Sequence, residues 1–336
     1  MKSIDKKIDF VVLWVDPSDK EWQKSRAKYI KAVSEVASID DSEDRYRDWD
    51  LFKFWFRGVE KYAPWVNKVH LVTCGHIPKW LNRKHPKLNI VKHSDFIPKE
   101  ALPTFNSNAI ELCVHNIPGL AEHFVLFNDD TFIVNNVKPE DFFKNGRPVN
   151  TMSLFAITPS GQRQYCRTLV NNIEIINDHF KFSTFKKKNL SRCFSIKQGK
   201  YLLTTLPLLA YGDFPGFKNY HIGNSYLKTT FDKVWAAEPQ KLTQTVNSKF
   251  RDYSSNVNHW LMNYWQFAEG NYCQHRASFG KSIKMDEPQT AKTISRQKAH
   301  IVCLAEPDCI ENQDEIRRRM YTAFESILPT KGGFEL

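Results

Sequence analysis

The sequence has no apolar run of about 20 residues, which is the length that a transmembrane helix requires. Its first apolar stretch, Phe10 to Val15, is too short for the hydrophobic region of a secretory signal and ends at Asp16-Pro17. These absences argue against an integral membrane protein and against a secreted one. We expect a cytoplasmic protein that is soluble or in peripheral contact with a membrane.

Cysteine and glycine are both scarce. The seven cysteines among 336 residues include no Cys-x-x-Cys pair, which argues against a zinc ribbon and a disulfide framework. The 13 glycines form neither a G-x-x-x-x-G-K-[ST] loop nor a G-x-G-x-x-G turn. Since G-x-S-x-G and H-E-x-x-H are also absent, the common signatures of NTPases, dehydrogenases, serine hydrolases and zinc proteases are all missing.

Positive charge is what the chain has in excess. Its net charge of +11 predicts an anionic partner, which could be nucleic acid, an acidic membrane surface or a phosphorylated substrate. Basic clusters such as Lys186 to Lys188 are spread along the chain without a recognisable RNA- or DNA-binding module. We therefore expect no nucleic-acid partner, and the simplest interpretation of each cluster is a solvated surface.

The C-terminal segment 314–328 has an amphipathic pattern. Apolar residues recur in it at helical spacing around the basic run Arg317 to Arg319: Ile316, Met320, Phe324 and Ile327. Such a helix could lie on the anionic inner surface of a membrane. Packing of this helix on the protein core is the interpretation that we favour.

Strands alternate with helices in the first half of the chain, which predicts an α/β fold with a mostly parallel sheet. The turn residues Asp16 to Asp19 include an N-cap for a helix that starts near Lys20. The pattern predicts strands at 8–15, 69–73, 89–92 and 124–127, and further helices at 49–62 and 107–115.

The pattern changes beyond about residue 150. It predicts a strand-like piece at 152–157, helices at 226–237 and 255–267, and a strand at 300–304. No repeat or Pro-rich linker divides the chain. We expect one catalytic domain, 1–336, with an α/β half at 8–160 and a helix-rich half at 161–336 that completes the active site.

Polar residues follow the predicted strands at their carboxyl ends. Asp16, Gly75 and Asp129 all lie at such ends, where open α/β sheets bind ligands. The adjacent carboxylates of Asp129 and Asp130 could hold a hard divalent cation beside phosphate oxygens or take part in acid-base chemistry. They could also simply cap a turn.

Three other segments carry candidate groups. Loop 102–111 opens a helix whose first amides could bind phosphate, although capping by Asn106-Ser107 explains the same residues. His221 lies in a short loop and could be catalytic or structural. Arg251 could bind phosphate through its planar guanidinium or pair with Asp252.

Taken in order, these segments resemble the Stealth family, which contains bacterial capsular polysaccharide phosphotransferases and the catalytic part of the animal GlcNAc-1-phosphotransferase. Four blocks carry the resemblance: 8–16 with Asp19, 45–136, 220–251 and 301–304. The second block is the most specific, with Arg45, Asp48, Arg57, Ala63-Pro64-Trp65-Val66, Ile77-Pro78-Lys79-Trp80-Leu81, the 102–111 loop, Ile117-Pro118-Gly119-Leu120 and Asn128-Asp129-Asp130.

The chain departs from the family pattern in two places. Cys303-Leu304 is followed by Ala305-Glu306 where the family usually has Asn-Asp, which leaves a ligand role for Glu306 open. Ile222 to Asn224 replace a Pro-containing stretch after His221, which could alter the acceptor side.

The resemblance implies a Rossmann-like, glycosyltransferase-A-like fold with an additional helical half. It also implies transfer of a hexose 1-phosphate from a nucleotide-sugar, with UDP as the expected nucleotide, to a glycan or lipid-linked oligosaccharide in bacterial capsular or cell-surface polysaccharide synthesis. The products would be a phosphodiester and a nucleoside monophosphate. Such a reaction needs charge neutralisation, in-line placement and a base, for which Mg²⁺ or Mn²⁺ would be the cofactor.

The resemblance further implies roles for individual residues. Asp129 and Asp130 would bind the metal, with Asp130 also the base, while His221 and Arg251 would stabilise the transferring phosphate. The expected substrate-binding residues are Trp14, Asp16, Arg45, Gly75, Asn108 and Glu111. Two alternatives stay open: a metal-dependent glycosyltransferase that releases a nucleoside diphosphate, and a non-catalytic module that binds nucleic acid or glycan.

Overall fold

The protein is built on a five-stranded sheet in the order β4-β3-β1-β5-β9. The structure is a computed structural model that describes residues 7–31, 39–40, 47–161, 163–307 and 312–336. The four parallel strands are β4 (Leu88–Lys92), β3 (Val69–Thr73), β1 (Ile8–Leu13) and β5 (His123–Asn128), and β9 (Asn224–Leu227) is antiparallel to β5. The predicted α/β fold with a mostly parallel sheet is confirmed.

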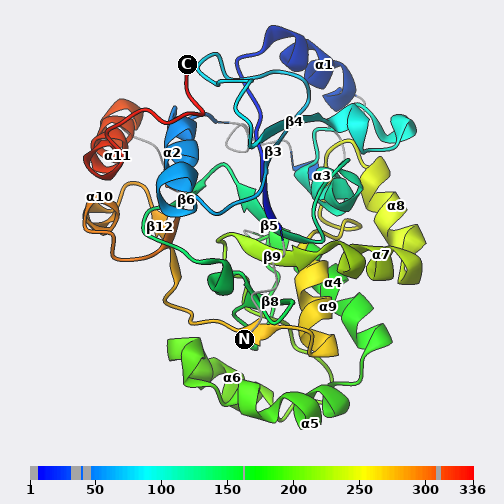
Figure 1. Ribbon diagram of the computed structural model, residues 1–336. Helices are drawn as coiled ribbons and strands as arrows, with labels where there is room; N and C mark the ends of the chain where they lie inside the picture. Colours follow the sequence, from blue (N-terminus) through cyan, green and yellow to red (C-terminus); the bar gives the residue numbers. More distant parts are fainter. Residues whose placement is uncertain (1–6, 32–38, 41–46, 162, 308–311) are drawn as a thin grey trace.

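Helices surround this sheet (Figure 1). The first half supplies α1 (Lys20–Ile30), α2 (Phe52–Tyr62) and α3 (Ser107–Cys113). The second half supplies α4 (Tyr165–His179), α5 (Phe182–Cys193), α6 (Leu202–Leu208), α7 (Lys228–Ala237), α8 (Pro239–Asn247), α9 (Trp260–Glu269), α10 (Pro288–Ser295) and α11 (Gln313–Ile327). As predicted, α1 starts at Lys20, and the Asp19 carboxylate caps it by accepting a hydrogen bond from the Trp22 amide.

Smaller sheets flank the central one. One of them has the order β12-β13-β6. The short strands are β2 (Ile39–Asp40), β6 (Thr131–Ile133), β7 (Phe143–Lys144), β8 (Arg147–Asn150), β10 (Arg251–Asp252), β11 (Cys273–Gln274), β12 (Gly280–Lys284) and β13 (Ile301–Ala305). Because β6 follows β5 after a two-residue turn and pairs with β13, this turn joins the central sheet to a strand from near the C-terminus.

Two expected elements differ in part from the structure. Segment 152–157 is strand-like but forms no regular strand: Leu154 makes an isolated antiparallel bridge with Phe217, and the Phe155 amide donates to the Gly216 carbonyl oxygen at 3.1 Å. A glycine allows this approach, because a Cβ at Gly216 would lie 2.6 Å from the Phe155 carbonyl oxygen. The helix expected from Tyr226 starts instead at Lys228. Tyr226 belongs to β9, where it lies opposite Phe124 of β5 and is fully buried.

Two apolar cores cover the two faces of the sheet. Alternate residues of β5 enter different cores, since Val125 and Phe127 join one while Phe124 and Leu126 join the other. Both cores draw on residues from both halves of the chain. This explains why β1, β3 and β5 are mostly apolar, as is usual for parallel strands buried on both faces. Two buried polar residues of these strands, Asp9 and His70, pair with each other at 3.0 Å.

The C-terminal helix α11 lies beside α2 over the first core (Figure 1). The rings of Phe54 and Phe324 stack there with their centroids 5.3 Å apart. The apolar residues of the helix are buried: Ile316, Met320, Ala323, Phe324 and Ile327. The structure therefore confirms that this helix packs on the core, and its apolar face is not available to a membrane.

A buried ion pair fastens the C-terminal tail to α2. The Arg57 guanidinium donates from Nε to Glu335 Oε1 at 2.6 Å and from Nη2 to Oε2 at 2.9 Å. A third bond runs from its Nη1 to the Leu328 carbonyl oxygen at 2.9 Å. Burial would raise the pKa of Glu335, but the bonds and charge of Arg57 outweigh it and hold that pKa below its ordinary value.

We expect Glu335→Gln to lower the free energy of unfolding by about 3 kcal/mol, because it leaves the buried Arg57 charge without its counter-ion. Urea unfolding followed by tryptophan fluorescence measures this change. Since the Glu335 pKa is lowered by folding, its contribution is present above its ordinary pKa of 4.5 and is lost as the pH falls through the folded-state value. Glu21→Gln, which removes an exposed ion pair with Lys24, is the matched control and should change stability by less than about 0.5 kcal/mol.

Candidate active site at the carboxyl edge of the sheet

The carboxyl ends of β1, β3 and β5 lie side by side. Leu13 of β1 is opposite both Val72 of β3 and Asn128 of β5, so the residues that follow these strands leave the sheet at the same edge. Asp129 and Asp130 form the turn between β5 and β6. The Asp130 carbonyl oxygen accepts a hydrogen bond from the Leu304 amide at 2.9 Å, which fixes the turn against β13.

His221 reaches Asp130 from the second half of the chain. Its Nε2 lies 3.5 Å from Asp130 Oδ2 and 3.2 Å from Asn128 Nδ2. The loop that carries His221 crosses the end of β5 so closely that a Cβ at Gly223 would lie 2.4 Å from the Phe127 ring. A glycine is therefore needed two residues after the histidine for the two groups to meet.

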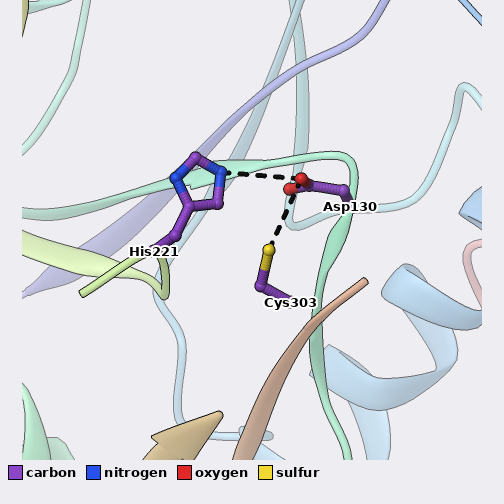
Figure 2. Close-up of side chains that lie close together, drawn as sticks. All are labelled: Asp130, His221 and Cys303. Atoms are coloured by element: carbon purple, nitrogen blue, oxygen red, sulfur yellow. Dashed lines mark hydrogen bonds and ion pairs between the residues drawn. The ribbon is translucent and has the colours of Figure 1, made fainter. Parts of the chain in front are cut away.

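Cys303 completes this cluster from β13. Figure 2 shows His221 and Cys303 directed toward the Asp130 carboxylate, with the Cys303 Sγ 3.5 Å from its Oδ2. The hydroxyl of Thr131 donates to the other carboxylate oxygen at 2.9 Å. The Asp130 carboxylate thus has partners from a loop, its own turn and a distant strand.

Charge pairing shifts the pKa values of Asp130 and His221 in opposite directions. Burial by itself would raise the pKa of Asp130, but the positive charge of His221 and the hydrogen bonds from His221, Thr131 and Cys303 lower it below its ordinary value. Burial would likewise lower the pKa of His221, yet the Asp130 charge raises it above the ordinary value. The pair therefore favours a carboxylate facing an imidazolium.

A second pair, Glu111 and Arg251, lies in the same electrostatic neighbourhood. Burial raises the pKa of Glu111 to about 7 against the opposing charges of Arg251 and His221. Arg251 Nη2 donates to the Ser107 hydroxyl at 2.5 Å, and Glu111 Oε2 lies 3.9 Å from His259 Nε2. Arg251 belongs to β10, and Glu111 to α3.

The three residues expected to be catalytic therefore share one neighbourhood. The pKa of His221, which burial lowers, is raised by the charges of Asp130 and Glu111 and lowered by that of Arg251. The Asp252 carboxylate, considered as an alternative partner of Arg251, accepts hydrogen bonds from the hydroxyls of Ser254 and Ser255.

Asp129 faces other carboxylates. Burial, with the negative charges of Asp130 and Asp48, raises its pKa to about 7. Burial raises the pKa of Asp48, and the negative charge of Asp16, which follows β1, also raises it. The carboxyl edge of the sheet thus collects acidic groups from three segments of the first half.

The oxygen-rich side of this cluster fits a hard divalent cation. Carboxylates are the protein ligands that Mg²⁺ and Mn²⁺ prefer, and the mutual repulsion that raises the Asp129 pKa would be relieved by a cation. Potential ligand atoms of Asp130, His221 and Cys303 lie within 4.8 Å of one another. Cys303 fits such a cation poorly, since burial raises its thiol pKa well above the ordinary value and the thiol donates to Asp130.

The residues expected to line the nucleotide pocket follow β1 and β3. Trp14 stacks on Phe52 at 5.7 Å between ring centroids and meets the edge of His76 at 5.2 Å. The Asp16 amide donates to His76 Nε2 at 2.8 Å. Gly75 has a φ of 133°, which favours glycine, and open space where a side chain would be. The expected ligand Arg45 lies outside the described residues.

The first turn of α3 was expected either to bind phosphate or to be capped by Asn106-Ser107. The structure shows a cap. The Asn106 side chain accepts a hydrogen bond from the Asn108 amide at 3.1 Å, so Asn106 is the N-cap. The Ser107 hydroxyl accepts a hydrogen bond from Arg251. Asn108, expected to hold donor sugar or phosphate, is buried in the first turn of the helix.

Glu306 has protein partners for both carboxylate oxygens. Arg47 Nη1 donates to Oε2 at 2.5 Å, and Trp49 Nε1 donates to Oε1 at 2.6 Å. This residue therefore fastens the segment before α2 to the end of β13. Sequence reasoning missed these contacts and the roles of Cys303 and Asp48, although both residues fall in the blocks that resemble the family.

Comparisons with known proteins show the family to which this chain belongs. The family description "Stealth protein CR1, conserved region 1" matches residues 6–34, and "Stealth protein CR2, conserved region 2" matches residues 45–150. A capsular polysaccharide phosphotransferase WcwK of Streptococcus pneumoniae is 42% identical over 100% of this chain and 99% of its own length. The chain belongs to the Stealth family.

Other relatives of this Stealth protein also match along nearly their whole length. The receptor polysaccharide phosphotransferase WefC of Streptococcus oralis is 38% identical over 98% of this chain and 99% of its own. The exopolysaccharide phosphotransferase cps2G of Lactiplantibacillus plantarum is 35% identical over 98% of this chain and 96% of its own length. The resemblance inferred from the sequence blocks is confirmed.

Among solved structures, the galactosyltransferase LgtC aligns with a TM-score of 0.41 and 10% identity, over 95% of this chain and 96% of its own. A likeness this distant bears on neither the reaction nor the ligands. In the described part of the chain, no helix has both the length and the apolarity needed to cross a bilayer.

We expect Asp130→Asn to lower the pKa of His221 by about 1 in protein freed of metal with EDTA, because the substitution removes the carboxylate charge that raises it. Histidine NMR titration measures this value. Thr131→Val, which removes a hydrogen bond to Asp130 but keeps its charge, should move the His221 pKa much less. An unchanged His221 pKa in the Asp130 variant would contradict the charge pairing.

Proposed function

We propose that this Stealth protein transfers a hexose 1-phosphate from a UDP-linked sugar to a hydroxyl of a glycan or lipid-linked oligosaccharide, in the synthesis of a capsular or cell-surface polysaccharide. The observation that carries the proposal is the charged cluster of Asp130, His221, Glu111 and Arg251. It lies in a chain whose full-length relatives are named polysaccharide phosphotransferases. We place the reaction in the cytoplasm, with peripheral contact at the anionic inner membrane surface.

The reaction exchanges one phosphorus–oxygen bond for another. The acceptor hydroxyl oxygen attacks the phosphorus that bears the sugar, and the bond from that phosphorus to the bridging oxygen breaks. The nucleoside monophosphate leaves with the bridging oxygen and its electron pair, while the acceptor proton passes to a base. Catalysis therefore consists of positioning, charge neutralisation and one proton transfer.

Residues of this chain supply each requirement. The imidazolium of His221 and the guanidinium of Arg251 neutralise charge on the transferring phosphate. Asp130, kept ionised by its partners, accepts the proton from the acceptor hydroxyl. Glu111, with a pKa of about 7, is the second carboxyl group in this cluster that could take the proton.

Asp129 and Asp130 would hold Mg²⁺ or Mn²⁺, the cofactor that we propose. When bound, the cation would neutralise oxygens of the donor diphosphate. Trp14, Asp16 and Gly75, at the same edge of the sheet, would line the nucleotide pocket, and Arg45 would also bind substrate. Asn108 and Glu111 would contact the donor sugar or its phosphate.

Product analysis tests the proposal. Incubation with UDP-sugars, Mg²⁺ or Mn²⁺ and a glycan acceptor should give a phosphodiester signal in phosphorus NMR and release UMP. Release of UDP with formation of a glycosidic bond would refute phosphate transfer in favour of a glycosyltransferase. Asp130→Asn should lower turnover about 100-fold or more while the protein stays folded, because the loss is in the transition state. Unchanged biological activity in this variant and in His221→Ala would instead favour a non-catalytic binding module.

Arg251→Lys tests the phosphate clamp. We expect kcat/KM to fall about tenfold or more, because an ammonium cannot make the two-point contact of a guanidinium. Steady-state kinetics on the UDP-sugar measures this loss. Arg296→Lys, at an exposed position, is the matched control and should leave the rate unchanged. A rate close to that of the wild type for the Arg251 variant would exclude a bidentate role.

A further inference from the structure

Segment 180–212 has an unusual charge composition. It contains seven basic residues and no Asp or Glu: Lys181, Lys186, Lys187, Lys188, Arg192, Lys197 and Lys200. It folds into α5, the 3₁₀ segment η6 (Ile196–Tyr201) and α6. Figure 1 places α5 and α6 together at the bottom of the molecule, at the end opposite α1.

Large apolar side chains stand out from this end of the protein. Ile196 of η6 is 86% exposed and Leu203 of α6 is 76% exposed. Leu190, Phe194 and Tyr211 are also more than half exposed. Apolar side chains this exposed are common when scattered singly, but here they lie within 22 residues of one another on adjoining elements, which marks an interaction surface.

The two helices turn different faces to the core and to solvent. In α5, Phe182, Phe185 and Cys193 are buried, whereas Lys187 and Leu190, three residues apart on either side of the kink at Asn189, are exposed. In α6, Leu208 is buried while Leu203 and Leu206 are exposed, again three residues apart. The outward face of the helices therefore combines leucine with lysine.

A groove lies beside this face. It has a volume of ≈ 550 Å³, and its lining includes Lys181, Lys188, Lys233 and Glu269. Lys233 pairs with the Glu269 carboxylate at 3.2 Å, so the ammonium groups of Lys181 and Lys188 are the ones that suit an anionic phosphate headgroup. This arrangement suits an anionic lipid surface. The acyl chains of the lipid would contact the apolar side chains, and its headgroups would contact the cationic groove.

We propose that the surface formed by α5, η6 and α6 docks on a bilayer that contains anionic phospholipid. A second copy of the chain fits less well, because a symmetric contact would bring seven basic residues of each copy together without an acidic partner in this segment. Nucleic acid fits less well because the most exposed side chains, Ile196, Leu203 and Leu190, are aliphatic and offer no ring on which a base could stack. The rings of Phe194 and Tyr211 are a smaller part of this surface.

The docking surface is connected to the candidate active site. Tyr201, the last residue of η6, packs edge-on against Tyr220 with ring centroids 5.5 Å apart. Tyr220 directly precedes His221. A protein docked through this surface would hold its His221 loop close to the bilayer, where the sugar of a lipid-linked acceptor is found. This step alone rests on the proposed function.

Vesicle co-sedimentation without donor or acceptor tests the docking. We expect binding to phosphatidylcholine vesicles that contain about 30% phosphatidylglycerol, and little binding to phosphatidylcholine alone. Lys187→Gln with Lys188→Gln should weaken binding about 25-fold, at about fivefold for each charge. Ile196→Ser with Leu203→Ser should weaken it by about tenfold or more. All four residues are exposed, so the variants should fold and keep their rate on a water-soluble acceptor.

Matched controls use exposed residues elsewhere. Arg317→Gln with Arg318→Gln removes the same charge from α11, and Leu336→Ser removes an apolar side chain that is 72% exposed. Neither should change vesicle binding by more than about twofold. Equal effects of the α11 variant, equal binding to both kinds of vesicle, or a dimer in solution that Ile196→Ser with Leu203→Ser dissociates would each overturn the proposal. Because the co-sedimentation is carried out without donor or acceptor, vesicle binding and the proposed reaction can fail independently.

Discussion

The contact between Asp130 and His221 is the interaction on which the candidate site depends. Asp130 stands at the end of a strand from the first half of the chain, and His221 arrives on a loop from the second half. Each holds the other in its charged form against the effect of burial. Through His221, this pair is also coupled to Glu111 and Arg251. Separating the two halves would therefore remove both the geometry and the charge balance of the cluster.

The neighbouring carboxyl groups differ because their surroundings differ. Asp130 has a positive partner, and its pKa is lowered. Asp129, next to it in the chain, faces Asp130 and Asp48, and its pKa rises to about 7. Because the pKa values of these adjacent acids differ, Asp130 remains ionised while Asp129 can bind either a cation or a proton. The fold produces it by sending one side chain of a two-residue turn toward His221 and the other toward acidic groups.

Much of the fold could be predicted from the sequence because its signals are local. β3 was predicted at its observed residues, and the start of α1 follows from the turn and cap at Asp16 to Asp19. Tyr226 was wrongly assigned to a helix, because its apolar neighbours suit either structure and only pairing with β5 makes it a strand residue. Segment 152–157 is strand-like as expected, but its partner around Gly216 is irregular, so the pairing is limited to an isolated bridge.

By itself, the sequence determined the class of fold, the family and the identity of the polar groups at the strand ends, because these follow from short-range patterns and from motifs. Only the tertiary structure decided which of those groups meet. It brought His221, Arg251 and Cys303 to Asp130 and Glu111 across more than 80 residues of chain in each case. It also tied Glu306 to Arg47 and Trp49 and buried the apolar face of α11. The physical reason is that pKa values and burial depend on neighbours in space, which no local pattern in the sequence specifies.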